Sequence, residues 1–156
     1  METRNVLPAD VRRELAAALQ PILAEAIDLE RQAKQAHWNV KGPGFYGRHK
    51  LFDELHELAE DWIDLVAERI AQLGHLTEGT LQRAAELTRL PVFPLGLTSE
   101  RDNLEQLAKA LSAFTAHTRE VLKKSEELGD PIAADILTEV TRGAEKYLWF
   151  VEAHLG

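Results

Sequence analysis

Apolar residues recur at intervals of three and four along most of the chain, and no segment shows the strict alternation of a half-buried strand. Residues that favour helices, chiefly Ala, Leu, Glu, Lys, Arg and Gln, dominate these segments. The pattern predicts an all-α chain with four long helices, at about 10–39, 45–73, 99–129 and 130–155. A short amphipathic helix is expected at about 80–88, inside a long connection.

Breaking residues set the ends of the first two helices. Gly42 and Pro43 end the first helix, and Gly74 ends the second. Asp10 is expected to cap the first helix. Pro21 lies inside that span and predicts either a kink or a later start.

Capping residues mark the last two helices. Ser99 and Asp102 have the spacing of a capping box, and Asp130 is a cap followed by Pro131 at the first helical position. Four long helices with one long connection, between the second and the third, are the arrangement of ferritin-like bundles. We therefore expect one ferritin-like domain that spans residues 1–156.

One face of the second predicted helix is polar along its whole length. Six residues on this face can bind a metal ion: His49, Asp53, His56, Glu60, Asp64 and Glu68. A solvated surface is the simplest interpretation of such a face. However, a spacing of four residues brings two ligands to one ion, and both His49 with Asp53 and Asp64 with Glu68 have this spacing.

The two pairs are too far apart to share an ion within one chain. Asp53 and Asp64 are separated by about 16 Å along a helix. A second copy of the helix could pack antiparallel across a two-fold axis between Leu58 and Ala59. His49 and Asp53 of one chain would then face Asp64 and Glu68 of the other chain. His37 ends the first helix close to the first pair and can complete it. The spacing thus favours two identical half-sites over three unrelated polar residues.

Composition narrows the chemistry of such a site. The chain has 156 residues and no cysteine, so a metal must be held by imidazole and carboxylate groups, which suit iron, zinc or manganese. The net charge of −8 disfavours binding to nucleic acid. No apolar run is long enough to span a membrane, and the start METRNVLPAD lacks the features of a signal peptide, so a cytoplasmic protein is expected.

The segments AHWNVKGPGFYGRHKLFDEL and DLVAERIAQLG resemble the signature of the Dps proteins, or miniferritins, which protect DNA in starved cells. The resemblance runs from DLERQAKQAHWNV through GTLQRAAELTRLPVFPL to EKYLWFVEAHL, and so covers nearly the whole chain. It implies a hollow dodecamer that oxidises Fe(II), preferably with hydrogen peroxide, and stores the mineral. It also implies a two-iron ferroxidase centre at a two-fold interface, with ligands His37, His49 and Asp53 from one subunit and Asp64 and Glu68 from the other.

The resemblance suggests roles for further residues. Asp130, Asp135 and Glu139 match acidic residues that line the iron-entry pores of the family, although a helix cap and two solvated acids would look the same. Trp38 either packs over the centre or carries oxidising equivalents. His75 departs from the family pattern; it is an accessory cation ligand or a partner of the carbonyls at the helix end.

Three other functions compete with this interpretation. An intrachain di-iron site of the ordinary ferritin type would need Glu-x-x-His motifs, which this chain lacks. Compaction of DNA is disfavoured because the expected N-terminal arm is short and carries no lysine-rich tail. A zinc- or manganese-binding cage without ferroxidase activity uses the same ligand types and stays open, with zinc as a competitor for the iron site.

Overall fold

The computed structural model describes residues 3–156, and the backbone of this part forms helices and no strand. The helices are α1 (Ala9–Asn39), α2 (Phe45–Gln72), α3 (Leu81–Leu87), α4 (Glu100–Glu127) and α5 (Pro131–Ala153). The all-α class and the short helix in the connection are both confirmed. Within residues 3–156, no helix is long and apolar enough to cross a membrane.

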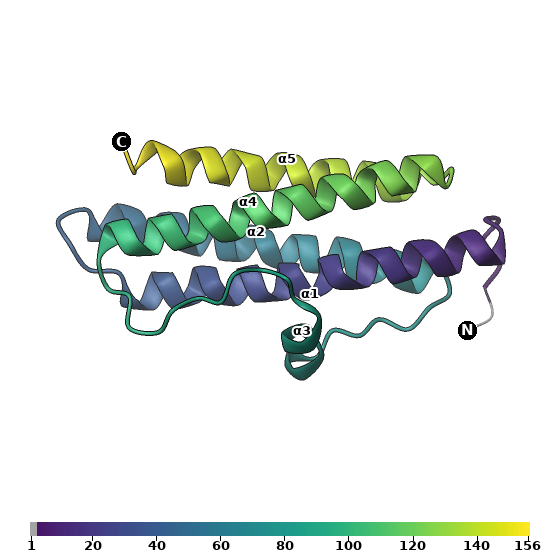
Figure 1. Ribbon diagram of the computed structural model, residues 1–156, viewed down its shortest axis with the longest axis horizontal. Helices are drawn as coiled ribbons and strands as arrows, with labels where there is room; N and C mark the ends of the chain where they lie inside the picture. The colour runs from purple at the N-terminus through teal and green to yellow at the C-terminus, as the bar shows by residue number, and fades with distance from the viewer. Residues whose placement is uncertain (1–2) are drawn as a thin grey trace.

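The four long helices form two antiparallel pairs that pack on each other. Figure 1 shows α1 beside α2 in one layer and α4 beside α5 in the other, with α3 lying outside the bundle next to α1. The connection from α2 to α4 runs along the length of the bundle, so α4 starts at the end where α2 started (Figure 1). This is the predicted ferritin-like topology with a long crossover.

The core lies between these layers and follows the predicted periodicity. Large side chains without solvent exposure come from all four long helices and include Leu15, Leu19, Ile22, Leu23, Leu29, Phe52, Leu55, Leu107, Phe114 and Leu137. Each contributes about 1.5–3 kcal/mol by leaving water. Smaller apolar residues of α5, such as Ala133 and Val140, complete the same cluster.

The predicted cap of α1 was wrong. The helix begins at Ala9 with Pro8 as its cap, and Asp10 lies in the first turn instead of capping it. Of the two outcomes expected for Pro21, the later start is excluded, because Pro21 lies inside α1. Buried residues on both sides of it, among them Leu19 and Ile22, anchor the two halves of the helix to the bundle, and this burial outweighs a cost of about 3 kcal/mol.

The predicted caps of α4 and α5 are confirmed. Ser99 Oγ accepts a hydrogen bond from Asp102 N at 3.0 Å, and Asp130 Oδ1 accepts one from Ile132 N at 3.2 Å. Pro131 occupies the first position of α5, where the missing N–H costs nothing.

The short loop between α1 and α2 is fastened to the start of α4. Gly44 N donates to Glu100 Oε1 at 2.6 Å, and Lys41 N donates to Thr98 O at 2.8 Å. Gly42 has a φ of 145°, and a Cβ there would collide with the Glu100 carboxylate, so glycine is required. This fixed loop sets how the end of α1 faces the start of α2.

Candidate metal centre

His37 at the end of α1 and His49 at the start of α2 lie face to face. Their ring centroids are 3.6 Å apart, and the ring planes are inclined by 20°. His37 is buried, and His49 is partly exposed. The structure therefore brings together two of the residues that were predicted to share a metal site.

Each of these histidines is held by the backbone of the other. His37 Nδ1 donates to the carbonyl oxygen of His49 at 2.7 Å, and His49 Nδ1 donates to the carbonyl oxygen of His37 at 2.9 Å. Because a carbonyl can only accept, Nδ1 of each ring carries the proton. In the neutral rings, both Nε2 atoms keep a lone pair that is available to a metal ion, as in many histidine metal sites.

Asp53 lies one turn after His49 and completes this group. Its Oδ1 is 3.8 Å from His37 Nδ1 and also forms an ion pair with Lys34 of α1. The hydrogen bond from Lys34 is the main reason that the pKa of Asp53 lies below the ordinary aspartate value, and the nearby His37 lowers it further. Asp53 is thus an ionised carboxylate, and the Lys34 ammonium sits where a cation is favoured.

Asp64 and Glu68 lie on the same continuous helix, and both are exposed. Along α2, Asp64 lies about 16 Å from Asp53, and Glu68 lies farther from it. A single chain therefore presents two separate groups of ligands. Whether they meet across a two-fold axis depends on the partner subunit, so the shared centre stays a prediction.

The two accessory candidates have different surroundings. Trp38 follows His37 directly, and its side chain is exposed, so the structure of one chain gives it no packing role over the centre. His75 lines a depression together with Arg12, Arg13 and Glu78. Positive charge exceeds negative charge there, which disfavours a cation.

The three acidic residues expected at a pore are not equivalent. Asp130 is 1% exposed and accepts two hydrogen bonds from Arg69 Nη2, at 2.8 and 2.6 Å. Asp135 and Glu139 project from the first turns of α5 and are exposed. In one chain, Asp130 acts as a helix cap and a buried ion-pair partner, while the other two acids are free to line an opening.

The sequence interpretation missed Lys34 and Glu30. Lys34 lies one turn before His37 on α1, and Glu30 lies seven residues before it, so both share the face of α1 that meets α2. Glu30 contacts His56 of α2. The i, i+7 spacing with His37 was the available signal, but nothing in it says which residue of α2 each one meets.

Comparison with known proteins agrees with this architecture. Residues 16–156 match the ferritin-like domain family. The DNA protection during starvation protein of Agrobacterium fabrum is 37% identical over 154 residues, which cover 99% of this chain and 95% of that protein. The fold of the present chain is similar to that of DpsC from Streptomyces coelicolor (TM-score 0.96, 30% identity, 100% of this chain and 91% of that chain).

A Dps from Microbacterium arborescens, whose structure was determined in a high-iron form, is similar over 99% of both chains (TM-score 0.89, 30% identity). The likeness to these proteins extends over whole chains and includes both the helices and the crossover. The chain therefore belongs to the Dps family of ferritin-like proteins.

Proposed function

We propose that this protein stores iron and oxidises Fe(II), its substrate, at centres shared between two subunits. One subunit supplies His37, His49 and Asp53, and its partner supplies Asp64 and Glu68. The observation that carries the proposal is the reciprocal pair of hydrogen bonds between His37 and His49, which leaves both Nε2 atoms free beside an ionised carboxylate.

The chemistry of these groups suits the oxidation of iron. Imidazole binds Fe(II), while carboxylates favour Fe(III) through their negative charge. Two Fe(II) ions each give one electron to one hydrogen peroxide molecule, which takes up two protons and leaves as two water molecules. Such a two-electron reduction releases no hydroxyl radical. The preference for peroxide over dioxygen follows from the family resemblance.

The proposed assembly is a hollow dodecamer. Asp135 and Glu139 are proposed to line its iron-entry pores, where exposed acids attract Fe(II). Because each chain carries a net charge of −8, the whole shell also attracts cations. Direct binding of DNA is not part of the proposal, since that charge repels phosphate, and removal of Fe(II) and peroxide would protect DNA without contact.

The test is stopped-flow absorbance of Fe(III) after Fe(II)-loaded protein is mixed anaerobically with hydrogen peroxide, with a spin trap for hydroxyl radical. We expect oxidation much faster than that of free Fe(II), at two Fe(II) per peroxide and with little trapped radical. The matched control is His49→Gln with Asp53→Asn, which should lose the fast phase. A parent protein no faster than free Fe(II), yet able to bind Zn(II) tightly, would instead support a zinc-binding cage.

A further inference from the structure

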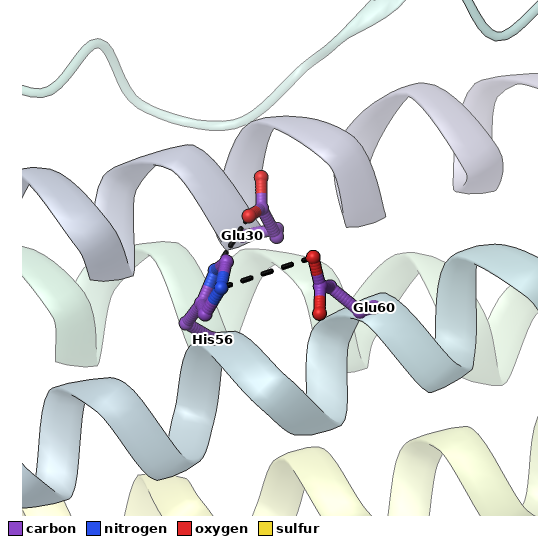
Figure 2. Close-up of side chains that lie close together, drawn as sticks. All are labelled: Glu30, His56 and Glu60. Atoms are coloured by element: carbon purple, nitrogen blue, oxygen red, sulfur yellow. Dashed lines mark ion pairs between the residues drawn. The ribbon is translucent and has the colours of Figure 1, made fainter.

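A second group of potential metal ligands lies beside the proposed centre, in the contact between α1 and α2. The group consists of Glu30 from α1 and of His56 and Glu60, one turn apart on α2, and is called the seam cluster below (Figure 2). His56 Nδ1 lies 2.5 Å from Glu30 Oε1, and His56 Nε2 lies 3.8 Å from Glu60 Oε1. One ligand atom from each side chain lies within 4.8 Å of the other two.

The burial of the seam cluster is graded from inside to outside. The Glu30 side chain is 6% exposed, that of His56 is 12% exposed and that of Glu60 is 61% exposed. A cation could thus enter past Glu60 and be held below the surface. The exposed Glu60 can also adjust, which matters because ligand atoms of one ion lie at most about 4.4 Å apart at bond lengths of about 2.2 Å.

One buried nitrogen of the seam cluster makes no hydrogen bond within the described part of the chain. His56 Nδ1 is shielded from solvent and, among the described residues, makes no hydrogen bond, although Glu30 is near. A buried nitrogen without a hydrogen bond is costly. The other neighbour of Glu30 is Arg31, whose side chain is 49% exposed and is free to move into solvent. The site therefore contains a potential ligand atom, His56 Nδ1, without a hydrogen bond within residues 3–156, and a positive charge, Arg31, that a metal ion can replace.

We propose that the seam cluster binds a divalent first-row transition metal ion through Glu30, His56 and Glu60. One imidazole and two carboxylates suit Fe(II), Zn(II) or Mn(II), and three protein ligands leave positions for water. Arg31 forms an ion pair with the carboxylate of Glu30 while the metal ion is absent. When the metal ion binds, the Arg31 side chain moves into solvent. Nothing in this step depends on oxidation of the metal.

The position of the seam cluster gives the site a role, and this part rests on the proposed function. His56 follows Asp53 by three residues, and Glu60 precedes Asp64 by four, so the cluster lies on α2 midway between the two groups of ferroxidase ligands. It is about 11 Å along the helix from the middle of each group. In the proposed dimer, a bound Fe(II) would wait between the two centres and supply either of them.

Titration with Co(II) alone, followed by its visible absorbance, tests binding without any oxidation. The experiment uses the full-length protein with the ferroxidase ligands disabled by His49→Gln and Asp53→Asn. We expect this protein still to bind Co(II) at the seam cluster. Addition of His56→Gln or Glu60→Gln should weaken that binding by at least about tenfold. The matched control, Glu57→Gln, removes an exposed acid of α2 outside the cluster and should leave it unchanged.

Two results would overturn the proposal. One is the absence of Co(II) binding in the protein with disabled ferroxidase ligands, and the other is binding that neither His56→Gln nor Glu60→Gln weakens. Because Glu60 is exposed, its substitution leaves the fold intact and keeps the test valid if His56→Gln unfolds the chain. Failure of the proposed function would appear separately, as slow Fe(II) oxidation by a parent protein that still binds Co(II) at the seam.

Discussion

Arg69 near the end of α2 holds Asp130 at the start of α5 through two hydrogen bonds from one guanidinium nitrogen, at 2.8 and 2.6 Å. Both side chains are almost entirely buried. Asp130 also caps α5 through Ile132 N. One carboxylate thus joins α2 to α5, through two residues that are 61 positions apart in the sequence. The ion pair therefore connects α2 to α5 at one end of the bundle.

Removal of one member of this pair should destabilise the protein strongly. Asp130→Ala leaves the buried guanidinium without a counter-ion, and such losses cost about 3–5 kcal/mol. Thermal unfolding at one fixed protein concentration should show a clear fall in Tm. Asp135→Ala, which removes an exposed acid from the same helix, should change stability by less than about 0.5 kcal/mol. Equal effects of the two substitutions would mean that the buried pair contributes nothing.

Because Asp130 is buried, the prediction for the pore concerns only the exposed acids Asp135 and Glu139. Asp135→Asn with Glu139→Gln should slow iron uptake at low Fe(II), because the exposed acids that attract the ion are lost. The oxidation of Fe(II) already bound should stay at the parental rate. Uptake is measured as mineral formed against time at several salt concentrations. If the parental rate and its salt dependence persist, these two acids are only solvated.

The shared centre can be tested by mixing two inactive proteins. One carries His49→Ala with Asp53→Ala, and the other carries Asp64→Ala with Glu68→Ala. Each alone should be nearly inactive. When they are refolded together, about half of the dimers are mixed and each mixed dimer regains one complete site of two, so roughly a quarter of parental activity is expected.

An intrachain site predicts no recovery at any mixing ratio. Light scattering should first establish that both proteins assemble, because a chain that cannot pair cannot complement. A stable monomer with full ferroxidase activity would contradict the shared centre in a different way.

Lys34 should control the acid sensitivity of the site through Asp53. The hydrogen bond from Lys34 lowers the pKa of Asp53 in the folded state, so its contribution to stability is complete above the ordinary aspartate pKa of about 3.9. That contribution is lost as the pH falls through the lowered pKa. In Lys34→Met, Asp53 should take up its proton at a higher pH. Lys34→Met should therefore lower Tm at pH values above about 3.9, where the parent has the full contribution, and the Tm curves of the two proteins should converge as the pH falls.

The control for this shift is Lys50→Met, which removes the same charge from an exposed position on α2. If both substitutions lower Tm equally and with the same dependence on pH, the effect comes from net charge and not from the contact between Lys34 and Asp53.

Gly143 of α5 should resist replacement even though it lies inside a helix. A Cβ at this position would lie 2.8 Å from Cζ2 of Trp62, a buried ring of α2. Alanine normally favours a helix over glycine by up to about 1 kcal/mol, whereas overpacking costs about 1–3 kcal/mol. Gly143→Ala should therefore lower Tm.

Gly47→Ala is the matched control, because the added Cβ would meet no described atom within 4 Å apart from its chain neighbours and the adjacent backbone of its own helix. It should keep or raise Tm. A higher Tm for Gly143→Ala would show that Trp62 moves aside at little cost.

Local features of the sequence were sufficient to predict the helices. The predicted span 45–73 compares with Phe45–Gln72, and the caps at Ser99 and Asp130 occur where expected. Periodicity, caps and breaking residues act within a few positions of the chain, so they can be read without any long-range information. The sequence left open whether α1 starts before or after Pro21, because the burial on both sides of Pro21 that anchors the helix is tertiary.

The candidate site divides in the same way. The spacing along α2 showed that His49 with Asp53 and Asp64 with Glu68 form two separate pairs, since helical rise alone determines that distance. Only the tertiary structure decided that Lys34 meets Asp53, that Glu30 meets His56 and that Asp130 meets Arg69. These contacts depend on how α1, α2 and α5 are aligned against one another. Helical periodicity specifies the face that each helix buries, but leaves its position along the neighbouring helix to side-chain packing.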